Sequence, residues 1–177
     1  MITAKNLIVA ALLLFQVSLF AQTARIDVVS PDKKTGMVFQ DAYEGVGVAQ
    51  AGWLGDIDKD KRIVAETPVV PGEWRECFFA FTPKASGQLQ IELMGEKGKW
   101  VEYAALSVEG ASLKNGDFSK LDAKGVPEGW NASGEAAVRK YGDSVCVRAN
   151  HDNRMSQKIQ AEAGKTITIS FKARQQD

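Results

Sequence analysis

Short runs in which apolar and polar side chains alternate fill most of the sequence and restrict its fold more than any other feature. The run TITISF (166–171) places Ile167, Ile169 and Phe171 on one face and three hydroxyl side chains on the other. The run GQLQIELMG (87–95) has the same arrangement. A period of two residues is typical of a β-strand with one buried face.

Nine further segments have the composition of strands: ARIDVVS, GMVFQDAY, GVGVAQAGW, RIVAETPVV, WRECFFAFTP, KWVEYAALSVEG, EAAVRKYG, DSVCVRAN and RMSQKIQA. Stretches rich in Gly, Pro, Asn and Asp separate them and predict turns. Only VEYAALSVEGASL (101–113) could instead be helical, and it lacks a sustained period of 3.6 residues. About eleven short strands with frequent turns predict an all-β fold, a jelly-roll β-sandwich.

The charge balance limits the classes of partner. The 177 residues carry 22 basic and 22 acidic side chains. A neutral chain lacks the basic surface that nucleic acids and anionic membranes attract, so no nucleic-acid partner is expected. A hydrophobic content of 45% is enough for a packed core.

The N-terminus has the layout of a secretory signal peptide. Lys5 precedes the apolar run LIVAALLLFQVSLF, which is followed by Ala21 and a polar stretch. The run is shorter than the roughly 20 residues of a membrane span. We take residues 1–21 as the signal peptide, with Ala24 as another cleavage position and an uncleaved anchor as the alternative. The mature chain would be secreted, periplasmic or on the cell surface, with no membrane span after cleavage.

Export would allow a disulfide bond between Cys77 and Cys146 to persist. Two cysteines permit a single intramolecular pair. The alternative is two buried free thiols that behave as small apolar residues. The sequence leaves both alternatives open.

Two sets of segments resemble a known family. LKNGDFSKLDAKGVPEGWNASG, AAVRKYGDSVCVRAN and SQKIQAEAGKTITISFKAR resemble the first half of carbohydrate-binding modules of the family-4/9/22 type. VVPGEWRECFFAFTPKASGQLQIELMG and VEYAALSVEG resemble the second half. These modules share a galactose-binding-like jelly roll and often accompany glycoside hydrolases. The resemblance therefore implies a carbohydrate ligand and a glycoside hydrolase as a partner.

The two halves occur in reversed order, with a seam near residues 110–115. This order implies one composite sandwich over residues 22–177 whose chain is circularly permuted, which closely spaced termini would tolerate. The alternative is a small β-sandwich at 25–111 followed by a partial carbohydrate-binding module at 113–177. The second unit would then expose an open sheet edge, which favours aggregation, so we favour the composite sandwich.

Aromatic side chains are the main candidates for ligand contact, because flat rings stack on the apolar faces of sugars while polar groups bind the hydroxyls. Trp74 and Trp130 are predicted to pack within the sandwich. The predicted exposed rings are Trp53 and Trp100, with Tyr43 and Tyr141 as weaker candidates. The predicted hydrogen-bonding side chains, which could equally form an ordinary polar loop, are Arg148, Asn150, Asp152, Asn153 and Gln157.

Nothing in the sequence points to catalysis. His151 is the only histidine, it lies in a polar loop, and no carboxylate pair stands out as a glycosidase site. The chain is therefore predicted not to be an enzyme.

The metal motifs are incomplete, so no cofactor is predicted. Asp56, Asp58 and Asp60 alternate as calcium ligands can, but Lys61 and Thr67 occupy the positions where an EF-hand loop has Gly and Glu. The resemblance implies a structural calcium ion near Asp117. However, Tyr103-Ala104-Ala105 stands where the paired acids of the closing strand are expected, which leaves calcium as a weak alternative.

The sequence predicts an exported, non-catalytic module that binds a polysaccharide or oligosaccharide by aromatic stacking. The alternative is a structural or protein-interaction β-sandwich domain at the cell surface without a sugar site. A third class, an enzyme with an unrecognised carboxylate pair, has less support.

Overall fold

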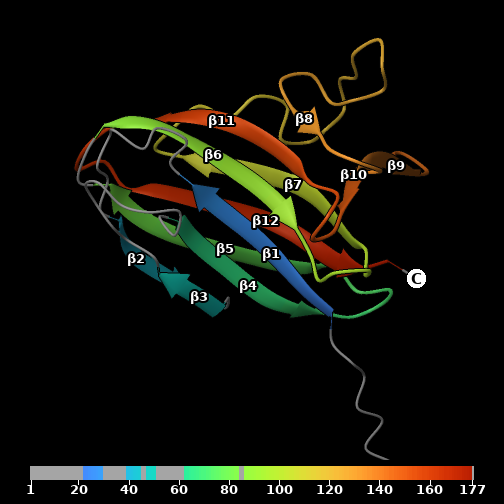
Figure 1. The fold of residues 1–177 in the computed structure, drawn as a ribbon, viewed down its shortest axis with the longest axis horizontal. Coiled ribbons are helices and arrows are strands. Elements are labelled where there is room, and N and C mark those ends of the chain that lie inside the picture. Colours follow the sequence, from blue (N-terminus) through green and yellow to red (C-terminus); the bar gives the residue numbers. More distant parts are fainter. Residues whose placement is uncertain (1–21, 30–38, 45–46, 51–61, 84–85, 177) are drawn as a thin grey trace, which may run out of the picture.

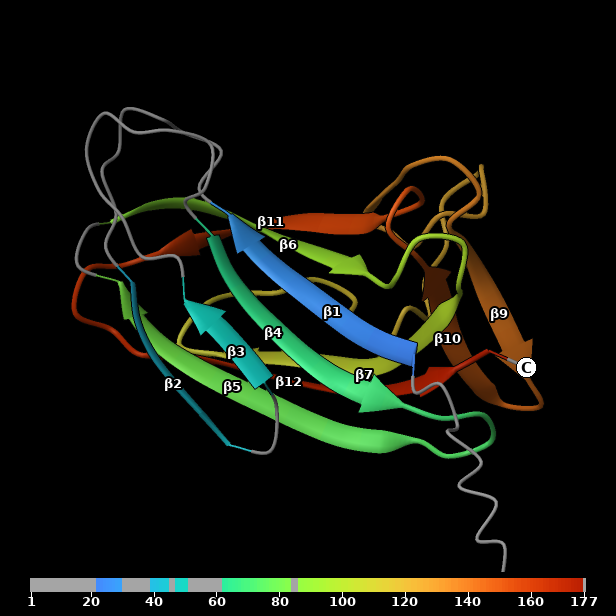
Figure 2. The same cartoon turned by 60° about the horizontal axis from the view of Figure 1, so that its bottom comes forward.

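A computed structural model describes residues 22–29, 39–44, 47–50, 62–83 and 86–176, with the backbone alone at Gln22, at Val29, in β2, in β3 and at residues 62–68. Its strands form two stacked antiparallel sheets (Figures 1 and 2). The predicted all-β sandwich is thus confirmed. In chain order the strands are β1 (Gln22–Val29), β2 (Phe39–Glu44), β3 (Gly47–Gln50), β4 (Arg62–Val69), β5 (Arg75–Pro83), β6 (Gly87–Met94), β7 (Val101–Glu109), β8 (Asn131–Ala132), β9 (Ala137–Tyr141), β10 (Ser144–Ala149), β11 (Met155–Ala161) and β12 (Ile167–Gln175).

The strand order shows that distant parts of the chain pair directly. Sheet A has the order β3-β4-β1-β6-β11-β8, and sheet B has the order β2-β5-β12-β7-β10-β9. Strand β11 pairs with β6, and β12 lies between β5 and β7. Strands from before and after the seam at residues 110–115 therefore share both sheets.

The alternating pattern decides which faces meet between the sheets. In β6, Leu89, Ile91 and Leu93 are fully buried, and in β12 the inward residues are Ile167 and Ile169. Each such side chain contributes roughly 1.5–3 kcal/mol when it is removed from water. The segment that could have been helical, around residues 101–109, is strand β7, while the two-residue strand β8 was not predicted. No helix in the described part of the chain is long and apolar enough to cross a membrane.

The NGDF segment at the seam, residues 115–118, forms a loop that hydrogen bonds and ring packing hold against the sandwich. Trp130 is 6% exposed, and its indole Nε1 donates to the carbonyl oxygens of Lys114 (3.1 Å) and Asn115 (3.2 Å). The Trp130 ring packs at 5.2 Å from the buried ring of Phe118. The predicted packing role of Trp130 is confirmed.

Gly116 lets this loop approach β7. The amide of Leu106 donates to the carbonyl oxygen of Gly116 at 2.9 Å, and a Cβ on Gly116 would lie 1.8 Å from the Leu106 oxygen. At the same place β7 contains a bulge opposite Phe171, with Ala105 at a φ of 49°. The bulge interrupts the ladder and frees the backbone of Leu106 to bind the loop.

Tyr103 joins the two sheets through a buried hydroxyl. Its ring lies in the core, and its oxygen accepts a hydrogen bond of 2.7 Å from the amide of Arg25 in β1. The same hydroxyl lies within hydrogen-bond reach of the carbonyl oxygens of Arg25 (3.1 Å) and Met94. Burial raises the pKa of Tyr103 far above its ordinary value, so the hydroxyl remains a proton donor.

No disulfide bond joins Cys77 and Cys146 in the structure, and both side chains are buried. Cys77 lies in β5 and Cys146 in β10, three strand positions away in sheet B. That spacing is roughly 14 Å, whereas the Cα atoms of a disulfide lie less than about 7 Å apart. Cys146 also belongs to the outer face of the sheet, since its electrostatic neighbours are Glu102, Arg174 and Arg139.

We predict that Tyr103→Phe lowers the free energy of unfolding by about 1–3 kcal/mol, because the substitution removes a buried hydroxyl that hydrogen-bonds the backbone of β1 and of Met94 in β6. Urea unfolding measures the change. Thr166→Val is the matched control, since it removes an exposed cross-strand hydroxyl and should change stability by less than about 0.5 kcal/mol. Equal effects of the two substitutions would contradict a special role of the buried hydroxyl.

We also predict that the thiols of the folded protein resist modification. Burial raises the pKa of Cys146 to about 12, so almost no thiolate exists at pH 8. An aromatic disulfide reagent should react slowly with the native chain and rapidly with both thiols in denaturant, without prior reduction. A denatured chain that yields no thiol until it is reduced would show that the bridge exists.

Candidate functional site

The outer face of sheet B gathers charged and aromatic side chains at one end. Three residues lie directly opposite one another on neighbouring strands: Arg174 on β12, Glu102 on β7 and Arg148 on β10. Side chains in such cross-strand positions are close enough to interact. The row places one carboxylate between two guanidinium groups.

Glu102 is fully buried although it points away from the sandwich core. Its Oε2 accepts a hydrogen bond of 2.7 Å from Arg174 Nε, and its Oε1 accepts one of 2.5 Å from the hydroxyl of Tyr141. This donation to Glu102 is the main cause that raises the pKa of Tyr141. A buried carboxylate is tolerated here because both of its oxygens have donors.

Arg174 is held between two aromatic rings. Its guanidinium carbon lies 4.6 Å from the ring centre of Trp74 and 4.6 Å from that of Tyr141. The two rings stay partly in solvent, with exposed fractions of 36% and 48%. A cation between two rings fixes their positions without covering them.

Arg148 lies over a third ring. Its guanidinium carbon is 4.3 Å from the ring centre of Trp100, which precedes β7 and is half-buried. We call Trp74, Trp100 and Tyr141, together with Arg148 and Arg174, the aromatic patch. The patch combines flat apolar surfaces with hydrogen-bond donors, which is the combination expected of a sugar-binding surface.

An open groove of about 510 Å³ continues along the same sheet from the aromatic patch. Phe78, which is 40% exposed, lines it together with Ala105 and Ser170. An ion pair of 3.0 Å between Lys172 and Glu76 also lies along the groove. Trp74 directly precedes β5 and Phe78 lies on it, four residues further along or roughly 13 Å in extended chain, so the two exposed rings define an extended surface.

The structure brings together three of the residues proposed from sequence, namely Trp100, Tyr141 and Arg148. Trp53 and the acidic run Asp56, Asp58 and Asp60 lie outside the described residues. Tyr43 is described only by its backbone, which pairs with Phe79 in sheet B.

Two of the proposed ligand-binding amides are engaged within the chain. Gln157 is buried in sheet A, where its side chain accepts a hydrogen bond from the Lys114 amide (2.7 Å) and donates one to the Lys114 carbonyl oxygen (2.8 Å). Asn150 is also buried, and its Oδ1 accepts hydrogen bonds from Asp152 and Asn153 in the same loop. We therefore assign both to the support of loops and leave them out of the site.

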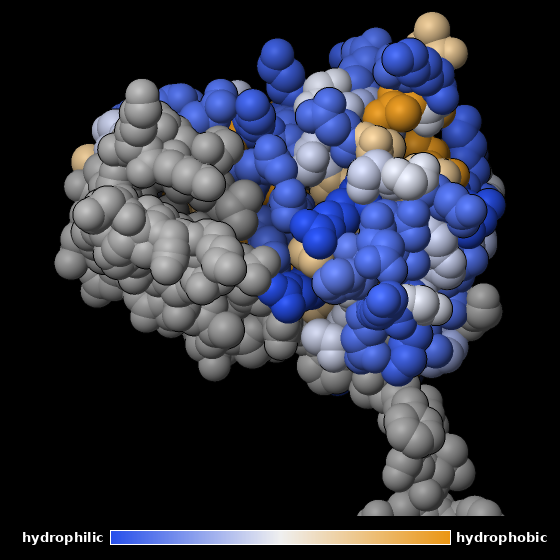
Figure 3. Space-filling view, viewed as in Figure 1, coloured by the Kyte–Doolittle hydropathy of each residue, from blue (hydrophilic) through white to orange (hydrophobic). Residues whose placement is uncertain are grey.

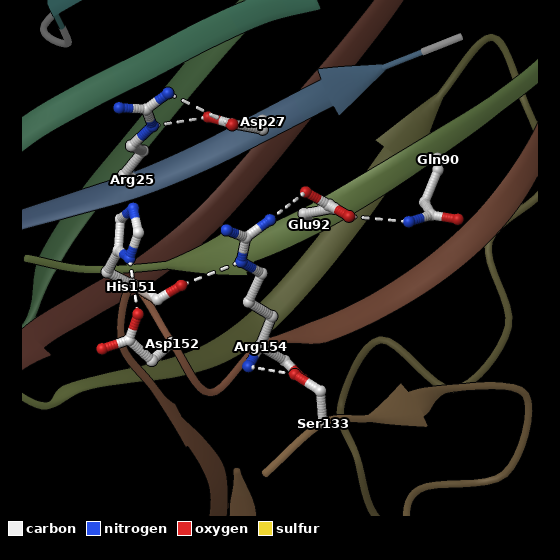
Figure 4. Close-up of polar contacts among 8 residues, drawn as sticks. All are labelled: Arg25, Asp27, Gln90, Glu92, Ser133, His151, Asp152 and Arg154. Carbon is white, nitrogen blue, oxygen red and sulfur yellow. Dashed lines mark hydrogen bonds and ion pairs between the residues drawn. The ribbon is translucent and has the colours of Figure 1, made fainter. Parts of the chain in front are cut away.

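The loop that contains Asp152 belongs to a polar network over sheet A. Arg154 is its centre, donating to Glu92 (3.2 Å) and to the carbonyl oxygen of His151 (2.9 Å). The carboxylate of Asp152 accepts a hydrogen bond of 2.8 Å from the His151 ring, and this hydrogen bond is the main cause that lowers the pKa of Asp152. Figure 4 shows this network, which joins Gln90, Glu92, Ser133, His151, Asp152 and Arg154, together with the separate ion pair of Arg25 and Asp27.

The face of the molecule drawn in Figure 3 is mostly hydrophilic where its residues are described. The contacts of the network join polar groups, and the ring that takes part in them is the imidazole of His151. A small hollow of about 270 Å³ beside it is lined by polar groups, including Thr23 and Glu96. The network accounts for the arrangement of residues 150–154.

Three members of the site were missed by sequence reasoning: Trp74, Glu102 and Arg174. The predicted packing role of Trp74 is wrong, because its ring is exposed just before β5 while the core residues of that strand are Cys77, Phe79 and Phe81. Alternation after Phe171 could have placed Arg174 outward. No sequence pattern indicated that Glu102 is buried, since burial of a carboxylate depends on hydrogen-bond donors from other strands.

The described residues contain no cluster of three or more His, Cys, Asp or Glu side chains that could hold a metal ion. Asp117 is exposed, and hydrogen bonds from Ser119 lower its pKa. Comparisons with protein-family models, curated proteins and solved structures gave no match. The assignment of the candidate site therefore depends on the arrangement of its residues in the structure.

We predict that Arg174→Met lowers the free energy of unfolding by about 3–5 kcal/mol, because it leaves Glu102 buried without its cation. Urea unfolding of the variant measures the loss. The double variant Glu102→Leu, Arg174→Met removes both charges and should recover most of it. A double variant as unstable as Arg174→Met would show that the ion pair is not the source of the effect.

Proposed function

We propose that this chain is an exported, non-catalytic carbohydrate-binding domain that holds a polysaccharide or oligosaccharide on the outer face of sheet B. The observation that carries the proposal is the pair of partly exposed rings, Trp74 and Tyr141, on either side of Arg174. Sugar rings would stack on these surfaces, and the groove toward Phe78 would receive further units. Affinity should be modest because an open groove leaves much of a sugar hydrated.

The sequence resemblance supports the same proposal. It suggests a galactose-binding-like jelly roll with its halves permuted, acting beside a glycoside hydrolase. The mixing of strands from both sides of the seam within each sheet is consistent with that topology. A shared fold does not by itself define a ligand, so the aromatic patch carries more weight than the fold.

A structural or protein-interaction domain is the second candidate. It is favoured by the way Glu102, Arg174 and Tyr141 satisfy one another, because such a network also stabilises a sheet without any ligand. The two candidates differ in whether the exposed rings respond to sugars.

We predict that Trp74→Ala and Tyr141→Ala each weaken binding of a polysaccharide about tenfold, since each removes a stacking surface. Calorimetric titration against a panel of neutral and acidic polysaccharides measures the affinity. Tyr141→Phe is the matched control: it keeps the ring, removes the hydroxyl donated to Glu102 and should retain binding.

Binding of no polysaccharide in the panel would exclude the sugar-binding proposal and leave the structural domain. Release of reducing ends from any polymer would instead identify an enzyme. Melting temperatures of all variants show whether lost binding reflects lost folding.

A further inference from the structure

We propose that the ligand is an acidic saccharide, and that Arg148 and Arg139 bind the carboxylate of a uronic acid unit. The inference rests on the proposed function and specifies its ligand class. It begins from the charges of the strand residues that point outward at this end of sheet B. The cations are Arg139, Arg148, Lys172 and Arg174, and the anions are Glu76 and Glu102.

Two of these cations are already neutralised. Lys172 pairs with Glu76 at 3.0 Å, and Arg174 pairs with Glu102 at 2.7 Å. Neither Arg139 nor Arg148 forms an ion pair with a carboxylate in the described part of the chain. A chain with zero net charge therefore concentrates two unpaired guanidinium groups beside its exposed rings.

Arg148 is unpaired although it lies directly opposite Glu102. Both oxygens of that carboxylate already accept hydrogen bonds, one from Arg174 and one from Tyr141. Arg148 instead lies over Trp100, with its guanidinium carbon 4.3 Å from the ring centre. Stacking orients a guanidinium group while leaving its N–H edge able to donate.

Arg139 is placed to act together with Arg148. It lies opposite Cys146 on β10, two residues before Arg148, and therefore on the same outer face. Diagonal neighbours of this kind are roughly 7–8 Å apart, a distance that long side chains bridge. The Nε atoms of both arginines are buried and have no hydrogen-bond partner within the described residues.

A carboxylate on a sugar fits these observations. Neither guanidinium group has a carboxylate acceptor within the described residues, and a ligand carboxylate would supply one to the outer N–H groups. Two planar guanidinium groups suit a carboxylate, which can accept two parallel hydrogen bonds from each fork. The adjacent ring of Tyr141 would pack on the apolar face of the same sugar unit.

The test compares polygalacturonate with its fully methyl-esterified form, which has the same backbone without the negative charge. Calorimetry of the full mature chain should show at least about tenfold tighter binding to the acid form, and added salt should weaken that binding. Equal affinity for both forms would overturn the acidic ligand and leave the carbohydrate-binding proposal standing. Binding of no polymer, in this pair or in the neutral panel, would overturn both.

Substitutions of Arg148 and Arg139 test whether these two residues bind the carboxylate. Arg148→Gln and Arg139→Gln should each lower affinity for polygalacturonate about tenfold while binding of the esterified polymer changes little. Arg148→Lys keeps the charge and loses the planar fork, so it should recover only part of the affinity. Lys158→Gln is the matched control, because it removes one exposed positive charge from β11 in sheet A. An equal loss in Lys158→Gln would show a general charge effect and overturn the assignment.

Two further ligands separate related chemistries. If the chain binds dextran sulfate but not polygalacturonate, the ligand group is a sulfate ester and the proposed carboxylate is wrong. If the chain binds polyglutamate as tightly as polygalacturonate, the proposal of a sugar ligand is wrong, because a peptide can then supply the anion. Preference for polygalacturonate over both supports a uronic acid ligand.

Discussion

The insertion of β12 between β5 and β7 is the contact on which the rest of this structure depends. Its inward side chains, from Ile167 to Ala173, fill the space between the sheets. Its outward side chains include Lys172 and Arg174, which pair with acids on β5 and β7. One strand thus completes the hydrophobic core and also supplies the central cation of the aromatic patch.

Glu102 is the carboxylate that pairs with Arg174 of this inserted strand. A carboxylate on the outer face of a sheet would ordinarily remain in water, but here Arg174 and Tyr141 occupy both of its oxygens. The same two hydrogen bonds hold a ring at 4.6 Å from the guanidinium group and leave Arg148 without a carboxylate. The polar network therefore determines both where the rings lie and which charges remain available to a ligand.

Strand positions were largely predictable, because alternation depends on neighbours along the chain. TITISF, GQLQIELMG and the other alternating segments form strands close to the predicted places, and Trp130 is buried as expected. The candidate site was predictable only in part. Trp100, Tyr141 and Arg148 come together, whereas Gln157 supports a loop in the other sheet.

The sequence by itself determined the strand content and the paired apolar faces, since burying one side of an alternating strand needs only local pattern and hydrophobicity. Only the tertiary structure decided which side of each strand faces solvent where both sides are apolar. In WRECFFAF, aromatic residues occupy both parities, and packing of Phe79 and Phe81 turned Trp74 outward. Packing likewise placed Cys77 and Cys146 three strands apart, because pairing partners depend on sheet order, which no local pattern encodes.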